Sequence, residues 1–223
     1  MGSFICYGRR AISAAMSQLR IAPIHRADLD VVADVHRRAF TDSAITALGH
    51  EAVRRYYGWL LDGPHDAALM GAWDRDQLVG FCAAGTFRGA LSGYLRENRV
   101  YLALRLLTHP WLATNEIVRD RVRTGMTVMV RYRRRRKPAA QPPAAPPRFG
   151  VLAIATDPEA QGGGVGRALM SEAEERARRI GFDRMVLSVH PHNHRAVRFY
   201  EGLGWMRSSL EASWNGAMEK QLR

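Results

Sequence analysis

Four glycines stand close together in the stretch DPEAQGGGVGRALM, at positions 162, 163, 164 and 166. The stretch FGVLAIAT before them is apolar almost throughout, which is typical of a strand buried on both faces, and Asp157 and Pro158 end it. The segment VGRALMSEAEERARRIG after them has helical periodicity and stops at Gly181. A strand, a glycine loop and a helix start in this order present backbone N–H groups at the positive end of a helix dipole, an arrangement that binds phosphate. Side chains at the four glycine positions would hold a phosphate away from those amides.

Two common phosphate-binding loops fail on spacing. A P-loop requires Gly, four residues and Gly-Lys-Ser/Thr, but no lysine follows these glycines. A dinucleotide-binding loop requires G-x-G-x-x-G and an acidic residue at the end of the next strand. This chain has G-x-G-x-G, and the next predicted strand, 185–190, ends in His190. The pattern that fits is Q-x-x-G-x-G, formed by Gln161, Gly164 and Gly166.

With NHRAVRFYEGLGW at 193–205 behind this loop, the sequence resembles the GNAT superfamily of acyl-CoA-dependent N-acetyltransferases. The resemblance covers 19–87 and 149–223 and is strongest from 149 to 205. It implies an α/β fold of the mixed α+β kind, with a strongly bent mixed central sheet flanked by helices. In that fold two parallel strands, here 149–156 and 185–190, splay apart, and acetyl-CoA lies in the gap between them.

The resemblance also implies the residues of the site. Family members bind the pantetheine arm of the cofactor at the end of the first splayed strand, which matches Ile154, Ala155 and Thr156. They bind the pyrophosphate through the loop, and the matching residues here are Gln161, Gly162, Gly163, Gly164, Val165, Gly166 and Arg167. An Asn matching Asn193 contacts the cofactor arm, and a Tyr matching Tyr200 lies near the sulfur. The alternatives are a plain helix cap for Asn193 and a packing aromatic for Tyr200.

The implied reaction moves an acetyl group from acetyl-CoA to a primary amine by direct attack in a ternary complex. A backbone N–H near Ile154 or Ala155 could polarise the thioester carbonyl. The phenol of Tyr200 could protonate the leaving thiolate as a general acid. The sequence does not identify the general base, because strand 149–156 carries no acid and Ser188 stands where some relatives have Glu.

His190 is the best titratable candidate for that base. A loop or capping role for this histidine, a water chain, or an acid from Glu51 or from the insertion described below are the alternatives. Cys6 and Cys82 have no metal-ligand spacing, and no metal is expected.

The elements that position these residues are predicted from apolar periodicity and turn signals. The amino-terminal part is predicted to contain a strand at Leu19–Pro23, a helix within 25–40 capped by Asp28, a helix within 49–61 with Tyr56, Leu60 and Leu61 inward, and a hairpin within 67–87 that turns at 74–77. The carboxyl-terminal part is predicted to contain strand 149–156, helix 165–180, strand 185–190, helix 194–202 and a strand pair around 205–209 and 216–222. Trp205 is predicted to be core, and His36 and His50 to lie on solvated helix faces.

Two stretches lie outside this plan of one domain over 19–223. Residues 1–18 are predicted to be a loose leader without the order of a signal peptide. Residues 88–148 are predicted to be an insertion, in part helical, that ends in a proline-rich linker and could cover the acceptor pocket. Between Arg119 and Lys137 nine positive residues stand against Asp120 alone. This run could bind nucleic acid or an anionic membrane, but a solvated arm is favoured.

The composition sets the remaining limits. The 223 residues are 47% hydrophobic and 24% charged, with a net charge of +12 that is almost all arginine. Two cysteines give no disulfide framework, so a reducing compartment, the cytoplasm, is expected. The acceptor is predicted to be a small-molecule amine or a protein amino group. A non-catalytic acyl-CoA-binding module, or an adaptor that binds an anionic partner through its basic arm, is the alternative function, and the oligomeric state is not predicted.

Overall fold

A computed structural model of the chain describes residues 19–111, 148–209 and 214–222. Seven strands form one sheet in the order β1-β2-β3-β4-β5-β7-β6. Their bounds are β1 Leu19–Pro23, β2 Asp66–Asp74, β3 Gln77–Thr86, β4 Phe149–Thr156, β5 Arg184–Ser188, β6 Met206–Arg207 and β7 Ala217–Gln221. Within the described ranges β4 and β5 pair in parallel, and the other neighbours pair antiparallel. The predicted mixed sheet is thus confirmed.

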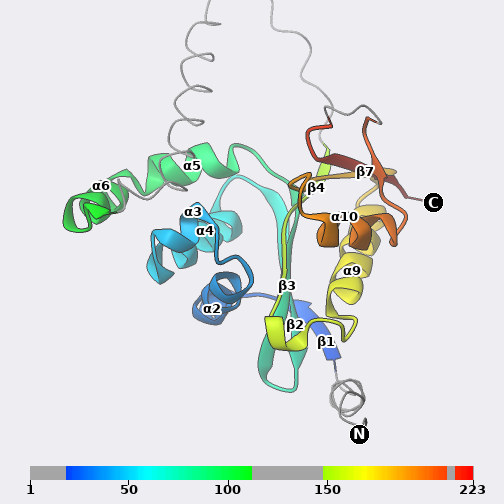
Figure 1. The fold of residues 1–223 in the computed structure, drawn as a ribbon, viewed down its shortest axis with the longest axis horizontal. Coiled ribbons are helices and arrows are strands. Elements are labelled where there is room, and N and C mark those ends of the chain that lie inside the picture. The colour runs from blue at the N-terminus through cyan, green and yellow to red at the C-terminus, as the bar shows by residue number, and fades with distance from the viewer. Residues whose placement is uncertain (1–18, 112–147, 210–213, 223) are drawn as a thin grey trace, which may run out of the picture.

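Helices cover both faces of the sheet (Figure 1). One face packs against α2 (Leu29–Ala39) and α4 (His50–Asp62), with the short α3 (Ala44–Ala47) beside them. The other face packs against α9 (Val165–Arg179) and α10 (His194–Glu201). Single turns of 3-10 helix precede α2 and α9, at Arg26–Asp28 and Pro158–Ala160. Two further helices, α5 (Ala90–Glu97) and α6 (Arg99–Thr108), lie beyond α3 and α4 at one end of the molecule.

The two parallel strands separate after a short contact. Residues Phe149 to Val151 of β4 pair with Met185 to Leu187 of β5, and no later pair follows. From there β4 continues to Thr156 with β3 as its single paired neighbour. The predicted splay is confirmed, but the prediction that this strand is buried on both faces is wrong for its second half, where Leu152 is 41% exposed. The side chains there have no neighbouring strand to cover them.

A β-bulge lies where the strands separate. Opposite β3, Ala84 pairs with Val151 and Ala83 pairs with Ala153, so Leu152 is the additional residue. Since side chains alternate along a strand, one additional residue exchanges the two faces. Val151 and Ile154 accordingly pack in the core under α9 and α10, whereas Ala155 packs in the core under α2 and α4. The bulge therefore places Ile154 on the face of the sheet that carries α10.

Three amino-terminal details differ from expectation. Asp28 does not cap α2 through its side chain but accepts from the backbone N–H of His25 at 2.8 Å, within the preceding turn. Tyr57 rather than Tyr56 is the fully buried tyrosine of α4. His36 was predicted to be solvated and is 5% exposed, which corrects that prediction, while His50 stays partly exposed, 3.3 Å from Asp34. His36 lies on the buried stripe of α2, seven residues after Leu29 and four after Val32, and its Nδ1 meets the hydroxyl of Tyr57 there.

Trp205 is buried, as predicted. The interval predicted to be an insertion lies between the end of β3 and the start of β4, and its first helix packs into the domain. Tyr94 of α5 is 1% exposed and donates to the carbonyl oxygen of Ala52 at 3.1 Å. A Cβ at Gly93 would approach Cζ2 of Trp59 to 2.2 Å, so the two helices touch. The predicted leader 1–18 and the arginine run 119–137 lie outside the described residues.

Candidate functional site

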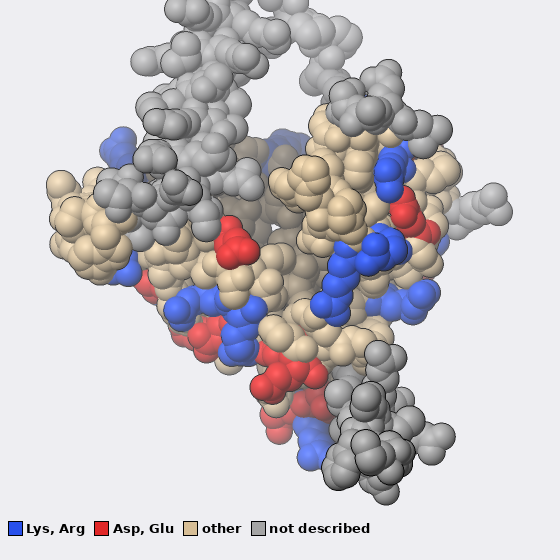
Figure 2. All heavy atoms as spheres, in the orientation of Figure 1, with Lys and Arg blue, Asp and Glu red and all other residues tan. Residues whose placement is uncertain are grey.

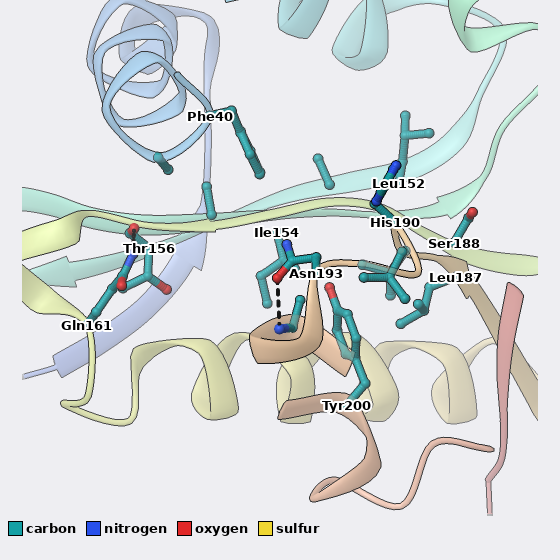
Figure 3. A pocket seen from close by; sticks show the side chains of 16 residues that line it. Phe40, Leu152, Ile154, Thr156, Gln161, Leu187, Ser188, His190, Asn193 and Tyr200 are labelled. Atoms are coloured by element: carbon teal, nitrogen blue, oxygen red, sulfur yellow. Dashed lines mark hydrogen bonds between the residues drawn. The ribbon is translucent and has the colours of Figure 1, made fainter. Parts of the chain in front are cut away.

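A cavity of about 300 Å³ occupies the opening between β4 and β5 (Figure 3). Its wall comes from the end of α2, the splayed part of β4, the end of β5 with the segment after it, and α10. The lining residues are Ala39, Phe40, Val151, Leu152, Ala153, Ile154, Ala155, Thr156, Gln161, Leu187, Ser188, Val189, His190, Asn193, Ala196 and Tyr200. The structure thus brings together seven predicted site residues, namely Ile154, Ala155, Thr156, Gln161, His190, Asn193 and Tyr200, while 162–167 do not line the cavity.

Tyr200 is held in the wall of this cavity by its ring and presents its oxygen to the opening. The ring packs beside Phe199 and Trp205, at centroid distances of 5.3 and 6.2 Å. The hydroxyl points toward the cavity, on the side of Ile154 and Asn193 (Figure 3), and no described residue hydrogen-bonds to it. Burial raises the pKa of the phenol well above its usual value. The group is therefore a protonated donor at neutral pH with its hydrogen bond unused.

The free edge of β4 supplies backbone groups to the same opening. The N–H of Asp157 donates to the carbonyl oxygen of Val79 on β3 at 2.9 Å. Successive peptide groups of a strand point to alternate edges, so the N–H of Ala155 points toward β3 and that of Ile154 points toward the gap. The carbonyl of Thr156 points the same way and accepts from Nε2 of Gln161 at 3.4 Å. Of the two amides considered from sequence, Ile154 is the one available to a ligand.

The glycines of the loop serve two different purposes. Gly162 and Gly164 adopt φ of +87° and +84°, and a Cβ on either would meet no atom within 4 Å. The left-handed backbone, rather than space, selects glycine at these two positions. A Cβ at Gly166 would instead lie 3.1 Å from Cζ of Phe199, so this glycine permits α9 and α10 to pack closely. Gly164 starts α9 without a side-chain cap, which leaves the first amides of the helix free for an anion.

An ion pair holds the base of the loop in place. Asp157 is 6% exposed; its Oδ2 accepts from Nε of Arg38 at 2.8 Å and its Oδ1 accepts from the N–H of Glu159 at 3.1 Å. Arg38 is near the end of α2, directly before the lining residues Ala39 and Phe40. The pair therefore joins the α2 wall of the cavity to the start of the glycine loop. Sequence analysis missed Arg38, because nothing local marks a partner 119 residues away.

Asn193 and His190 lie on the loop between β5 and α10. Oδ1 of Asn193 accepts from the N–H of Ala196 at 3.1 Å, so the residue caps α10 and keeps its amide N–H₂ for a ligand. His190 is exposed at the rim, and its Nδ1 accepts from the N–H of His192 at 3.3 Å. That bond favours the tautomer with the proton on Nε2. To accept a proton at Nε2, the neutral ring would have to carry its own proton on Nδ1. It would then lose the hydrogen bond that Nδ1 accepts from His192.

The acid considered as an alternative base does not reach the cavity. Glu51 accepts from Nε of Arg54 at 2.7 Å and from Nε of Arg55 at 2.6 Å, and these hydrogen bonds, that from Arg54 first, lower the pKa of its carboxyl. It is absent from the lining, and no lining residue in the described part of the chain is acidic. In the same ranges no three His, Cys, Asp or Glu side chains are placed to hold a metal ion.

A buried histidine stands behind the α2 wall. The ring of His36 lies 4.8 Å from that of Phe40, and its Nδ1 lies 2.8 Å from the hydroxyl oxygen of Tyr57. Nε2 of His36 is buried with no hydrogen-bond partner in the described structure. Burial lowers the pKa of His36 to about 4, so the ring is neutral. Phe40 is thereby supported by an uncharged aromatic cluster.

Comparison with protein families gives one match over most of the chain. The family described as acetyltransferase (GNAT) family matches residues 29–205. Among solved structures, PaiA N-acetyltransferase from Thermoplasma acidophilum in complex with coenzyme A aligns with a TM-score of 0.56 at 14% identity, over 92% of this chain and 99% of that chain. The ribosomal-protein-S18-alanine N-acetyltransferase from Escherichia coli aligns with a TM-score of 0.53 at 13% identity, over 92% and 94%. At these identities the two likenesses establish the fold.

Similarity to curated proteins is confined to short segments. The mycothiol acetyltransferase of Geodermatophilus obscurus is 39% identical over 67 residues, which is 30% of this chain and 22% of that protein. The mycothiol acetyltransferase of Salinispora arenicola is 41% identical over 70 residues, 30% of this chain and 23% of that protein. The match thus spans less than a quarter of the length of either relative.

Proposed function

The chain belongs to the acetyltransferase (GNAT) family, and we propose that it moves an acetyl group from acetyl-CoA to a primary amine that attacks the thioester directly in a ternary complex. One observation carries this proposal. Tyr200 presents a buried, protonated and unpartnered hydroxyl to a cavity between two splayed strands, beside the free edge of β4. A non-catalytic module for acyl-CoA would have no use for a proton donor at that place.

Each part of acetyl-CoA has a matching element in and beside the cavity. The pyrophosphate would bind to the amides of the loop 162–167, where the uncapped start of α9 adds its dipole. The pantetheine arm would run along β4 and use the peptide edge that Ile154 and Thr156 direct into the gap. The free amide N–H₂ of Asn193 would donate to the same arm. These contacts would bring the thioester to Tyr200; the aligned PaiA structure is itself a complex with coenzyme A.

The chemistry then needs three groups. The amine attacks the thioester carbon, and the N–H of Ile154 stabilises the oxygen on which charge develops, a type of donor that contributes about 10²–10³ in rate. Carbon–sulfur cleavage follows, and Tyr200 gives its proton to the thiolate. The proton of the attacking amine leaves through His190 or through water at the open rim, since no lining residue is acidic. His190 is the titratable group closest in sequence to the splayed end of β5 that also lines the cavity.

The acceptor is proposed to be a small-molecule amine or a protein amino group. The α2 side of the cavity offers Phe40, Ala39 and Leu152, without a carboxylate to bind additional positive charges. This wall favours an amine on an uncharged or apolar carrier over a polycation. The acceptors of the mycothiol acetyltransferases and of the S18-alanine acetyltransferase should be included in a test. The similarity of these enzymes to this chain is too short or too low to select either acceptor.

Cys82 is a free, buried thiol, and we propose the cytoplasm as the compartment.

A thiol-release assay with acetyl-CoA and a panel of amines tests this function. The panel contains polyamines, amino sugars, aromatic amines and short peptides with free amino termini. Thiol release that depends on the amine, and that falls in a Tyr200→Phe variant, is the expected result. Calorimetric binding of acetyl-CoA with no turnover for any amine would overturn the enzyme assignment and favour the binding module.

A further inference from the structure

Helix α6 exposes most of its large apolar side chains, while Tyr101 and Leu102 are half-buried. Two polar contacts join it to the rest of the protein: Nε of Arg105 donates to the carbonyl oxygen of Leu48 at 3.1 Å, and the ring of Tyr101 lies under the guanidinium of Arg55 at 4.6 Å. Val100, Leu104 and Leu107 are 65%, 56% and 77% exposed. Their spacing of four and three places them on one stripe of the helix. A helix at the surface of a globular domain normally has the opposite arrangement.

The stripe extends beyond α6. Leu91 and Leu95, one turn apart on α5, are 60% and 47% exposed, and Trp111 after α6 is 61% exposed. Seven large apolar side chains are therefore exposed within 21 residues of sequence; Leu106 is one of them at 39%, and we call the other six, Leu91, Leu95, Val100, Leu104, Leu107 and Trp111, the α5–α6 face. Figure 2 shows a largely uncharged lobe where Figure 1 places α6, with basic atoms beside it. Large apolar side chains gathered in one region of a surface are a feature of interaction sites.

The charges around this face indicate what covers it. Arg96 and Arg99 are exposed on the same two helices; Arg96 lies 3.5 Å from the carboxylate of Glu97, so the two helices keep a positive balance through Arg99, and the whole chain has a net charge of +12. A second copy of the chain would bring like charges together at such a contact. An anionic lipid surface supplies both an apolar layer and opposite charge, and leucines, a tryptophan and arginines on one amphipathic region are the composition of helices that lie in such an interface. None of the described helices is long and apolar enough to cross a membrane.

We propose that the α5–α6 face binds the surface of an anionic membrane. The leucines and Trp111 enter the boundary between headgroups and acyl chains, and the flanking arginines contact the phosphates. Opposite charge attracts such arginines to an anionic surface, and salt screens that attraction. The face is separate from the catalytic opening, because neither α5 nor α6 lines the cavity.

The test is sedimentation of the full-length chain with vesicles of phosphatidylcholine alone and of phosphatidylcholine mixed with phosphatidylglycerol. We expect binding to the mixed vesicles that weakens with salt. A Leu104→Glu, Leu107→Glu double variant should lose about tenfold or more in partitioning, because two apolar side chains that would leave water are replaced by charges that the anionic surface repels. The matched control is Ile180→Glu, Met206→Glu, which changes two apolar residues of 43% and 61% exposure elsewhere on the domain and should bind as wild type does. Retained acetyl-CoA binding shows that each variant is folded.

Three outcomes would overturn the proposal. The first is no binding of the wild-type chain to mixed vesicles. The second is binding that survives the double leucine variant but is lost when the four arginines at 133–136 are changed to glutamine, which would assign the membrane contact to that run. The third is a mass in sedimentation equilibrium without lipid that falls from dimer to monomer in the leucine variant, which would make a second copy the occupant.

Discussion

At the scale of single residues, the proposed chemistry depends on one oxygen atom of Tyr200. Tyr200→Phe removes it and keeps the ring that packs beside Phe199 and Trp205. We expect kcat to fall about 10²-fold, the low end for a lost general acid, and the affinity for acetyl-CoA to change by less than about threefold. Steady-state kinetics and calorimetry measure the two. Because burial raises the pKa of this phenol, its ionisation should not limit wild-type kcat up to about pH 10, its unperturbed value.

Tyr94→Phe is the matched control for Tyr200→Phe. It also removes a buried hydroxyl, but one that donates to Ala52 and lies away from the cavity. It should cost about 0.5–1.5 kcal/mol of stability and leave kcat at the wild-type value. If the two variants lower kcat equally, Tyr200 is a packing residue, and the thiolate takes its proton from water.

His36 predicts a pH dependence of stability. Its pKa is lowered to about 4 in the folded state by burial, whereas in the unfolded chain it keeps a value near 6.5. Between these values the unfolded state binds the proton and the folded state does not, so stability falls as the pH falls through this window. The expected loss between about pH 7.5 and pH 5 is on the order of 2 kcal/mol. Urea unfolding at the two pH values measures it.

A His36→Gln variant isolates that contribution. Glutamine does not titrate, so the stability of the variant should be less sensitive to acid. It can still hydrogen-bond to Tyr57, but the variant should be less stable than the wild-type chain at neutral pH. An unchanged pH dependence in the variant would show that other groups cause the loss. The residue also marks a limit of the sequence: helical spacing from Leu29 places His36 on the buried stripe of α2, but the hydrogen bond that accommodates its ring comes from Tyr57, 21 positions away, and no local signal records that contact.

At the scale of elements, the two ends of α9 provide a controlled test of the phosphate loop. Gly164 and Gly181 both have positive φ, +84° and +87°, and a Cβ on either would meet no atom within 4 Å. Gly164→Glu and Gly181→Glu should therefore cost similar backbone strain, about 1–2 kcal/mol. Only the first places a carboxylate at the proposed pyrophosphate site. We expect calorimetry to show that Gly164→Glu loses about tenfold or more in acetyl-CoA affinity by like-charge repulsion, and that Gly181→Glu keeps it.

The second variant decides how the first is interpreted. Equal losses of acetyl-CoA affinity in both variants would mean that α9 responds to strain or to net charge, and wild-type affinity in both would refute the loop as the phosphate site.

Sequence pattern predicted the strands and helices around this loop well, since apolar periodicity and glycine spacing are local. It could not predict the bulge at Leu152, because the bulge is defined by the register against β3, 70 residues earlier. That bulge is what places Ile154 on the face of the sheet that carries α10.

At the scale of the whole molecule, the segment between β3 and β4 divides into parts of different character. Sequence composition marked its position, since proline and arginine runs are visible without a structure. It did not show that α5 completes the core, because the burial of Tyr94 requires the helix α4 beneath it. Nor did it show that α6 contacts the domain through Arg105 with Leu104 and Leu107 exposed. The hypothesis that helices of this segment cover the acceptor pocket finds no support in the described residues, because none of α5 or α6 lines the cavity.

Two replacements by a flexible Gly-Ser linker test this division. Replacing 99–147 removes α6 and all that follows but keeps α5, so stability should change by no more than about 1 kcal/mol, the range of surface contacts. Replacing 88–147 also removes Tyr94, and a buried aromatic lost from a core costs about 3–5 kcal/mol. Thermal unfolding distinguishes the two variants, and each should bind acetyl-CoA while folded, because the cofactor residues lie outside both deletions.

The acceptor kinetics of the shorter replacement give the last prediction. The described cavity is walled by α2, β4, the segment after β5 and α10, so kcat and the acceptor KM should both stay within about threefold of wild type, a difference below 1 kcal/mol. Binding to anionic vesicles should be lost in the same variant, since Leu104 and Leu107 are gone. A large rise in the acceptor KM with unchanged kcat would show instead that residues of 99–147 bind the acceptor directly. Catalysis and membrane binding can therefore be separated in one protein only if α6 serves the surface and not the cavity.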